Sequence, residues 1–551
     1  MASRRAPSDA NHDAPVAVVD PSADPVRDAI SNGWTRRDVL GALAAGAACG
    51  FASPVLAALP SSPSSGLLLR DVLLVDGSGQ PGQRTDVLVR GDRIDHIGRV
   101  SAGEARGLRI VDGGGRVLAP GFIDLHTHGD PLTKAYTQFL AMGVTTVLLG
   151  QDGGSPSLEG KSRAADSLPS WLAAVARTTP DVNVATLSGH GALRRRAGID
   201  DGARRPSDSQ LERMQAILGH DLRAGAFGMS TGLEYVPGRY AETRELASLG
   251  PVIARHDGVA MSHMRNEDAD AVRASIRELV AASGPARAHV SHLKMVYGKG
   301  AAAAEDLLAF LQSLRVDGRR LTADAYPYEA SYTGVAILFP EWALPPADYA
   351  AVRDARRDQL RAHLQQRMAQ RNGPDALLFG TGPHAGKTLA QVAAERDVPF
   401  ADALLDIGPG GGQAAHFVMD RALQDRLLLD PRVALGSDGS PGGSHPRSAG
   451  TFARFIEELV VKQQRLPLEE AVRKATSLPA SILGLEDRGT IRAGAKADLI
   501  LFDPAKVHAR ADYVHPTTQA EGFDLVVVNG QPAFEAGEAV ARTGRLLRRG
   551  A

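Results

Sequence analysis

The chain of 551 residues is poor in cysteine and in aromatic side chains, and it carries almost no net charge. Its single cysteine, Cys49, allows no intramolecular disulfide and no thiolate metal cluster. An aromatic content of 5% argues against a platform for stacked bases. A net charge of −1 gives no reason to expect nucleic acid or an anionic membrane as partner, so a small-molecule substrate is expected.

The remaining composition is that of an ordinary soluble globular protein, with 43% hydrophobic and 23% charged residues. The length exceeds one ordinary domain, which predicts either two domains or one barrel with additions. The oligomeric state cannot be read from this composition.

Residues 1–58 have the pattern of an export leader. The pair Arg36-Arg37 precedes a run of small apolar residues that ends near Leu59, and Val55 and Ala57 suit a cleavage site. Paired arginines before a weakly apolar core resemble a twin-arginine signal, which predicts a periplasmic or secreted protein with no stable membrane insertion after cleavage. The alternatives are an uncleaved membrane anchor and lipid attachment at Cys49.

After the leader, both ends of the chain have the sequence pattern of β-strands. Residues 59–117 alternate apolar and polar side chains, and Val87–Ile97 predicts a hairpin that turns at Gly91-Asp92. Residues 486–551 have the same β-strand pattern. We expect one small β-sandwich formed from both termini, with separate terminal β domains as the alternative.

The middle of the chain, residues 118–485, alternates apolar strands with helical segments, the pattern of parallel βα units. The predicted fold class is therefore α/β, a TIM (β/α)8 barrel with the terminal sandwich attached. One connection is too long for an ordinary loop, so an inserted lid is expected at about residues 329–430. The eight candidate strands are Val117–Leu125, Val144–Leu149, Asn183–Leu187, Ala226–Ser230, Val259–Ser262, Ala288–Ser291, Leu321–Ala325 and Arg432–Ser437.

Metal-binding side chains stand at the ends of several of these strands. His126 and His128 are two residues apart, so both imidazoles project from one face of a strand. His263, His292 and Asp438 each end a separate apolar run. Because the chemistry of a TIM barrel lies at the carboxyl ends of its strands, this arrangement predicts a divalent metal site suited to hydrolysis.

Two of the candidates have a further predicted role. Asp438 could both bind the metal and take a proton from an attacking water, with the cap of a following helix as the alternative. His190 is a candidate for polarising a substrate carbonyl, with an ordinary turn histidine as the alternative.

Several longer motifs resemble the D-aminoacylase (N-acyl-D-amino-acid deacylase) branch of the amidohydrolase superfamily. The resemblance extends from about Gly66 to the C-terminus. The motifs are Pro120-Gly-Phe-Ile-Asp-Leu-His-Thr-His128, Gly143-Val-Thr-Thr-Val147, Ser230-Thr-Gly-Leu-Glu-Tyr-Val-Pro-Gly238, Ser262-His-Met-Arg-Asn-Glu267, Ser291-His-Leu-Lys294, Asp324-Ala-Tyr-Pro-Tyr328, Gly436-Ser-Asp-Gly439 and His445-Pro-Arg447.

This resemblance implies a zinc-dependent hydrolase that cleaves the amide bond of N-acyl-D-amino acids. It implies that His126, His128 and Asp438 form one metal position, and that His263 and His292 form a tighter one. It also implies that side chains near the lid hold the substrate carboxylate. The candidates for that role are Arg447, Lys294, Tyr326 and Tyr328.

One position departs from the family pattern. The family has Gly-Asn-Cys-Gly after its second strand, with the cysteine as a zinc ligand, whereas this chain reads Gly150-Gln-Asp-Gly153. A carboxylate can replace a thiolate on zinc, so Asp152 is the predicted ligand, and its two oxygens can bridge two ions. The alternative is another donor such as Glu234, and the substitution leaves open whether one or two ions bind.

Other functions use similar ligands. A dipeptidase acting on a D-residue, or a cyclic-amide hydrolase related to hydantoinase or dihydroorotase, would be served by the same fold and metal site. A non-catalytic scaffold is the alternative from another class, but such proteins are expected to lose metal ligands. The preferred acyl group and amino-acid side chain cannot be read from the sequence.

Overall fold

The computed structural model describes residues 66–156, 167–315 and 321–550. The predicted leader, residues 1–58 with Cys49, lies outside the described residues. Within these ranges, no helix combines the length and the hydrophobicity needed to cross a membrane.

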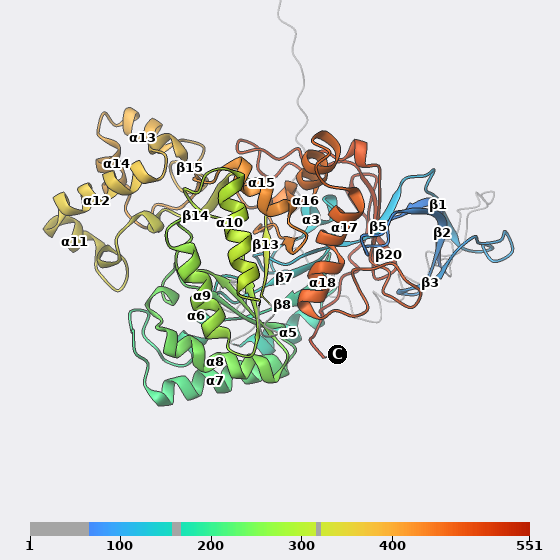
Figure 1. Ribbon diagram of the computed structural model, residues 1–551, viewed down its shortest axis with the longest axis horizontal. Coiled ribbons are helices and arrows are strands. Elements are labelled where there is room, and N and C mark those ends of the chain that lie inside the picture. Colours follow the sequence, from blue (N-terminus) through green and yellow to red (C-terminus); the bar gives the residue numbers. More distant parts are fainter. Residues whose placement is uncertain (1–65, 157–166, 316–320, 551) are drawn as a thin grey trace, which may run out of the picture. The chain divides into compact units, whose positions relative to one another are not determined.

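Parallel strands from the middle of the chain form two sheets that meet at both edges (Figure 1). β8 and β9 are consecutive parts of one strand, and β9 pairs with β10. At the other edge, Thr127 bridges Gly439. Eight strands therefore close into a barrel, which confirms the predicted fold class. They are β6 (Phe122–Asp124), β7 (Val144–Leu149), β8 (Asn183–Thr186) with β9 (Ser188–Gly189), β10 (Gly228–Gly232), β11 (Val259–His263), β12 (Arg287–Val290), β13 (Leu321–Ala325) and β17 (Val433–Leu435).

The predicted first strand, Val117–Leu125, is wrong as a single element. β5 (Val117–Pro120) pairs with strands of the terminal sheet, and only β6 belongs to the barrel. Gly121 separates the two strands, and a Cβ at this position would lie 2.2 Å from the side chain of Thr145. Glycine therefore lets the backbone pass close to β7 as it crosses between sheets, and the barrel begins after residue 120.

Amphipathic helices follow the barrel strands, and buried leucines, valines and isoleucines on their inner faces join the main hydrophobic core. In α7, Ser207 and Gln210 form a capping box that defines the helix start. The barrel helices are α3 (Thr137–Ala141), α5 (Leu168–Ala176), α6 (His190–Arg196), α7 (Asp208–Arg223), α8 (Thr243–Arg255), α9 (Val272–Ser283), α10 (Gly300–Ser313), α15 (Arg421–Leu429), α16 (Arg447–Phe455), α17 (Leu468–Ala475) and α18 (Ser477–Leu483).

Strands from both ends of the chain pair with each other, as predicted, so separate terminal β domains are excluded. They form one nine-stranded sheet, where a sandwich was expected. β5 joins the two halves because it pairs with β1 on one side and with β18 on the other. The predicted hairpin is present, with Arg90 opposite Arg93. The strands are β1 (Leu67–Leu74), β2 (Gln83–Arg90), β3 (Arg93–Ile97), β4 (Arg109–Asp112), β5, β18 (Leu499–Phe502), β19 (Phe523–Val528), β20 (Gln531–Glu535) and β21 (Glu538–Ala539).

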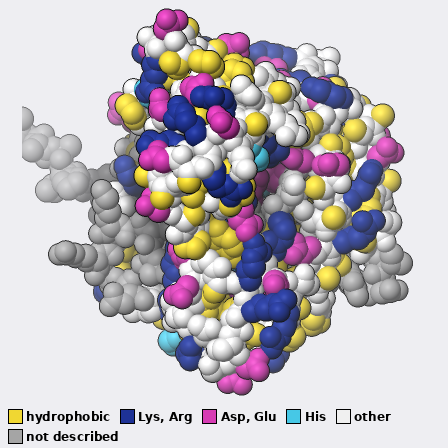
Figure 2. All heavy atoms as spheres, turned by 90° about the vertical axis from the view of Figure 1, so that its left-hand side faces the viewer, with side chains coloured by type: hydrophobic (Ala, Val, Ile, Leu, Met, Phe, Trp, Pro, Cys, Tyr) yellow, Lys and Arg dark blue, Asp and Glu magenta, His cyan; other side chains and the backbone are white. Residues whose placement is uncertain are grey.

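The insertion has its own hydrophobic core, separate from that of the barrel. It ends earlier than the predicted residue 430, because α15 packs against α10 and buries Leu423 and Leu427 in the barrel core. Seen from the side of the insertion, basic and acidic side chains are interspersed over the visible surface (Figure 2). The inserted elements are β14 (Ala330–Gly334), α11 (Tyr349–Ala355), α12 (Arg357–Gln370), β15 (Leu377–Phe379), α13 (Leu389–Glu395), α14 (Phe400–Ile407) and β16 (Gln413–Phe417).

A buried polar network connects the terminal sheet to the barrel, and we predict that disrupting it destabilises the fold. The Asp498 carboxylate accepts hydrogen bonds from Arg488 and, at 3.0 Å, from the Asn183 side chain of β8. We expect Asp498→Asn to lower the free energy of unfolding by about 3 kcal/mol, because Arg488 then stays buried without its counter-charge. Urea unfolding measures this. The control is Asp95→Asn at an exposed ion pair, and equal losses in both variants would contradict the prediction.

Candidate metal centre

The carboxyl ends of the barrel strands bring all the predicted metal donors to one place. His126 and His128 follow β6, Asp152 follows β7, and Asp438 follows β17. His263 is the last residue of β11, and His292 follows β12. The backbones of Asp152, His292 and Asp438 have positive φ values of 53°, 36° and 54°. Non-glycine residues seldom adopt this conformation, and such strain is typical of functional sites.

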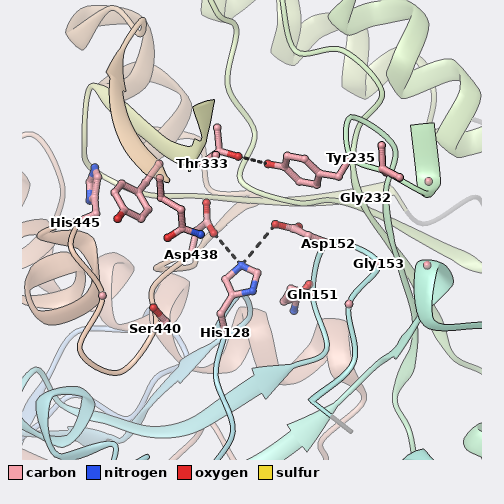
Figure 3. Close-up of a pocket in the computed structure, with 18 of the residues that line it drawn as sticks. His128, Gln151, Asp152, Gly153, Gly232, Tyr235, Thr333, Asp438, Ser440 and His445 are labelled. Carbon is pink, nitrogen blue, oxygen red and sulfur yellow. Dashed lines mark hydrogen bonds and ion pairs between the residues drawn. The ribbon is translucent and has the colours of Figure 1, made fainter. Parts of the chain in front are cut away.

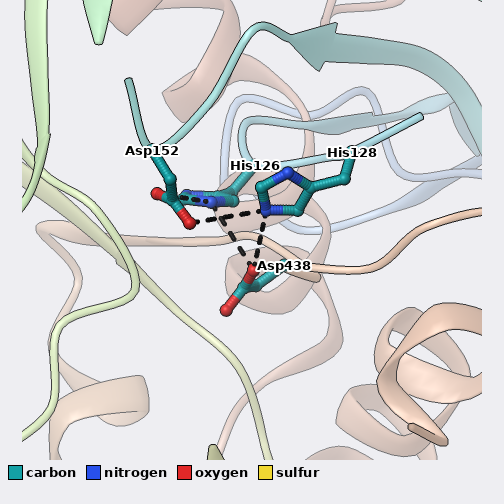
Figure 4. Close-up of side chains that lie close together, drawn as sticks. All are labelled: His126, His128, Asp152 and Asp438. Carbon is teal, nitrogen blue, oxygen red and sulfur yellow. Dashed lines mark hydrogen bonds and ion pairs between the residues drawn. The ribbon is translucent and has the colours of Figure 1, made fainter. Parts of the chain in front are cut away.

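The first group of donors is His126, His128, Asp152 and Asp438 (Figure 4). His126 Nε2 lies 3.4 Å from Asp152 Oδ1 and 3.6 Å from Asp438 Oδ1. His128 Nε2 lies 3.5 Å from Asp152 Oδ2 and 3.2 Å from Asp438 Oδ1. Donor atoms from all four residues lie within 4.8 Å of one another, so one cation can contact them together.

The second group consists of Asp152, His263 and His292. Asp152 Oδ1 is 3.6 Å from His292 Nε2, and Asp152 Oδ2 is 3.8 Å from His263 Nδ1. Asp152 is thus the residue that both groups share. Its position near the centre of four imidazoles is the geometry expected of a carboxylate that bridges two cations.

The electrostatic environment keeps both aspartates ionised. Burial by itself would raise the pKa of Asp152, but the surrounding histidines, His126 foremost, hold it well below its usual range. For Asp438, burial is likewise outweighed by Arg447 and the histidines, so its pKa is also lowered. Burial lowers the pKa of His126, which favours the neutral imidazole that a metal requires.

Unsatisfied polar atoms show that this donor set fits a metal ion. Among the described residues, His126 Nε2 and Asp152 Oδ1 are buried and have no hydrogen-bond partner. Buried polar atoms without partners are rare in folded proteins, and here they face one another across a space lined by nitrogen and oxygen donors. A divalent cation would satisfy them together.

Further carboxylates support the donors, and sequence reasoning missed most of them. Asp124 Oδ1 accepts hydrogen bonds from the backbone N–H groups of His126 and Ser437, at 3.1 and 2.9 Å. It thereby fixes the ends of β6 and β17 together. Asp324 accepts from the His292 N–H at 2.9 Å and contacts the buried His289. The available signal was their place in a strand, since Asp124 ends β6 and Asp324 lies within β13, but many structural acids share such a place.

Two glutamates lie behind the second group of donors. Glu234 Oε2 is 3.1 Å from His263 Nε2, and Glu267 Oε1 is 3.1 Å from His292 Nδ1. Each contacts the ring nitrogen that points away from Asp152. Carboxylates in such positions orient a histidine and fix its tautomer when the other nitrogen binds a metal. Glu234, the alternative ligand in the sequence, therefore contacts His263 on the side opposite Asp152.

A cavity of about 510 Å³ opens beside the first donor group. His128, Asp152 and Asp438 form its inner end, and glycine-rich turns, including Gly153 and Gly232, form one wall (Figure 3). Opposite these turns, β14 supplies Tyr332 and Thr333. The volume is suitable for a small organic substrate.

The predicted carboxylate-binding residues have different surroundings. Arg447 lines the large cavity, and its Nη1 lies 2.7 Å from Asp438 Oδ2. Tyr326 and Lys294 line a smaller cavity beside the histidines, where the Lys294 ammonium donates to Glu267 at 2.8 Å. The expectation for Tyr328 is wrong, because its buried hydroxyl donates to the Pro446 carbonyl oxygen at 3.2 Å, away from both cavities.

The expectation that His190 polarises a substrate carbonyl is also wrong. His190 begins α6 and is completely buried, and its Nε2 lies 2.7 Å from Glu245 Oε1. Glu245 also accepts a hydrogen bond from the buried Arg194 at 2.5 Å. His190 therefore belongs to a structural polar cluster, and its neighbour Gly191 lines the cavity instead.

Comparison with known proteins gives consistent matches. The family model described as "Amidohydrolase family" matches residues 109–396 and 411–534. N-acyl-D-glutamate deacylase of Alcaligenes xylosoxydans xylosoxydans is 36% identical, over 88% of this chain and 97% of that protein. D-aminoacylase of the same organism is 32% identical, over 87% and 98%. A similar solved structure is that of N-acyl-D-glutamate deacylase from Bordetella bronchiseptica, complexed with zinc and a phosphonate mimic of the tetrahedral intermediate. It superposes with a TM-score of 0.77 at 32% identity, and the match covers 88% of this chain and all of that one.

The shared position of Asp152 generates a prediction about metal binding. We expect Asp152→Asn to weaken the affinity for divalent metal ions at least tenfold, because the first donor group loses one of its two carboxylates and the second loses its only one. Removing even a residue that only supports a metal ligand typically lowers metal affinity by about 10- to 100-fold. Metal content after dialysis, measured by mass spectrometry, tests this. Asp130→Asn is the matched control, since Asp130 is a buried aspartate outside the donor groups that accepts a hydrogen bond from Trp171. Equal metal retention in the two variants would contradict a bridging role.

Proposed function

Because the chain belongs to the amidohydrolase family, we propose that it is a metal-dependent hydrolase that cleaves N-acyl-D-amino acids into a carboxylate and a free D-amino acid. The observation that carries this proposal is the pair of donor groups, joined by Asp152, at the inner end of a cavity of about 510 Å³. The relatives named above, which span nearly the same length, support the substrate class.

The proposed cofactor is zinc, as in the related crystal structure. His126, His128, Asp438 and Asp152 would hold one ion, and His263 and His292 would hold a second that shares Asp152. Bound zinc lowers the pKa of a water from 15.7 toward about 7 and polarises a carbonyl. The donors are nitrogen and oxygen atoms only, which suits zinc and also harder divalent ions.

Asp438 is the residue proposed to move the proton. It is ionised, and its Oδ1 lies among the donors while its Oδ2 contacts Arg447. It can therefore accept a proton from an attacking water at one end of the cavity. Asp438 would then return this proton to the departing amine nitrogen, so that one carboxylate serves first as base and then as acid.

Three residues are proposed to hold the substrate carboxylate. Arg447 is a buried cation that lines the large cavity, and Tyr326 and Lys294 line the adjoining small cavity. The Tyr326 hydroxyl is buried and has no hydrogen-bond partner among the described residues. A carboxylate between them would satisfy this donor and position the amide next to Asp438.

We also propose that residues 1–58 direct export to the periplasm or the exterior. Support comes from the Arg36-Arg37 pair, the apolar run and the small residues Val55 and Ala57. Cell fractionation, with detection of a mature form that begins near Ala58, would test this.

A substrate panel tests the proposed activity. N-acetyl and N-formyl D- and L-amino acids, D-dipeptides and cyclic amides are incubated with the purified protein, with zinc added and with zinc chelated. We expect release of free D-amino acids in the presence of zinc only. Turnover confined to D-dipeptides or cyclic amides would replace the proposal by one of those functions, and an inactive protein without stoichiometric metal would support a scaffold.

The role of Asp438 gives a second prediction. In Asp438→Asn, kcat should fall by about 10²- to 10⁴-fold, because the amide cannot accept the proton from water. Bound zinc should largely remain, since the histidines and Asp152 are unchanged. Steady-state kinetics combined with metal analysis distinguish these effects, and near-normal turnover would refute the proton-transfer role.

A further inference from the structure

A second, small cavity of about 20 Å³ lies on the side of the donor cluster that faces the insertion. His263, His292 and Asp438 of the barrel line one side of it. Ile337 and Arg371 of the insertion also line it, and Arg371 follows directly after the end of α12. The cavity is therefore formed jointly by the metal centre and the inserted segment.

Each carboxylate that lines this cavity already has a partner. Glu267 accepts from Lys294 at 2.8 Å, and Glu234 contacts His263 at 3.1 Å. Asp268 pairs with Arg367 at 3.0 Å, and Asp438 pairs with Arg447 at 2.7 Å. Among the described residues, this pairing leaves one charged group of the lining, Arg371, without a counter-ion.

Arg371 is a buried cation without an ion pair among the described residues. It is 3% exposed, and its Nε has no hydrogen-bond partner there. Among the described residues, its side chain makes one hydrogen bond, a long one of 3.5 Å from Nη1 to the Tyr297 hydroxyl. A buried charge is costly unless it is paired, so an unpaired guanidinium beside a cavity indicates a site for an anion.

A second donor at the same cavity is also unsatisfied. The Tyr326 hydroxyl has no hydrogen-bond partner in the described part of the chain. Tyr326 comes from the barrel, whereas Arg371 comes from the insertion. Two unsatisfied donors on different elements require acceptors at two points. A ligand with two carboxylates supplies both, one for each donor.

We propose that Arg371 binds the side-chain carboxylate of the substrate, and that the preferred substrates are therefore N-acyl derivatives of acidic D-amino acids. This inference rests on the proposed function, in which Tyr326 and Lys294 receive the α-carboxylate. Arg371 is a specificity-determining residue in this arrangement, because a neutral side chain leaves its charge unpaired. A relative named for D-glutamate, at 36% identity, is consistent with a dicarboxylate substrate.

The small cavity adjoins the large one. Tyr235, Tyr332 and Thr333 line both cavities, so they form the wall between them. Tyr235 and Thr333 are connected by a hydrogen bond of 3.2 Å between their hydroxyl groups (Figure 3). The free volume suits a group the size of a water molecule, so a substrate side chain that enters from the large cavity would have to displace this pair.

The test compares Arg371→Met with wild type on N-acetyl-D-glutamate and N-acetyl-D-leucine, using the zinc-loaded enzyme. We expect the ratio of kcat/KM for the acidic over the neutral substrate to fall by roughly 10- to 100-fold, mainly through KM, because a charge-assisted hydrogen bond is lost. Arg371→Lys should lose less, since it retains the charge. Arg353→Met, at a partly exposed arginine on α11 outside both cavities, is the control and should keep the wild-type ratio.

A binding measurement makes the test independent of turnover. Glutarate should raise the melting temperature of wild type more than butyrate does, and this difference should disappear in Arg371→Met. The variant should fold, because it removes an unpaired cation and leaves no carboxylate without its partner.

An unchanged substrate ratio, or an equal loss on both substrates, would overturn the role of Arg371. A wild type active on N-acetyl-D-leucine but not on N-acetyl-D-glutamate would overturn it while the proposed function stands. Inactivity on both substrates with zinc bound would overturn the proposed function, and the inference with it.

Discussion

Four imidazoles surround the carboxylate of Asp152 at the mouth of the barrel, and the remaining site residues are arranged around this contact. His126, His128, His263 and His292 come from three different strands, and each has a ring nitrogen between 3.4 and 3.8 Å from an Asp152 oxygen. The distances are too long for strong hydrogen bonds and leave space for cations between the groups. Because Asp152 belongs to both donor groups, its position determines whether the two groups act as one centre.

The backbone around Asp152 is adapted to this position. The residue has a φ of 53°, and a Cβ on Gly232 would lie 2.1 Å from its carbonyl oxygen. A glycine in β10 therefore lets the Asp152 turn lie directly against the barrel. Buried acids then fix the histidines: Asp124 and Asp324 bind backbone N–H groups at the strand ends, while Glu234 and Glu267 contact the outward ring nitrogens. The geometry of the donors thus depends on a surrounding layer of carboxylates that lie outside both donor groups.

The insertion and the barrel supply different parts of the site. The barrel supplies the metal donors and Asp438, whereas β14 and Arg371 supply the walls that a substrate side chain would contact. The insertion also has its own hydrophobic core. Sequence changes in this segment can therefore alter which side chain fits, with little effect on the donors.

The sequence by itself determined the strand pattern, and with it the metal donors, because parallel strands are continuous apolar runs and their functional residues follow directly at their ends. His126, His128, Asp152, His263, His292 and Asp438 could all be chosen on that basis and on motif resemblance. The crossing at Gly121 could not be foreseen, because apolar strands of two different sheets are continuous in sequence there. Only the tertiary structure decided the contacts of His190 and Tyr328. His190 contacts Glu245 from another helix, and the Tyr328 hydroxyl donates to the Pro446 carbonyl oxygen. That Arg371 has no ion pair among the described residues could not be foreseen either, since pairing of a buried charge depends on contacts between segments far apart in the chain.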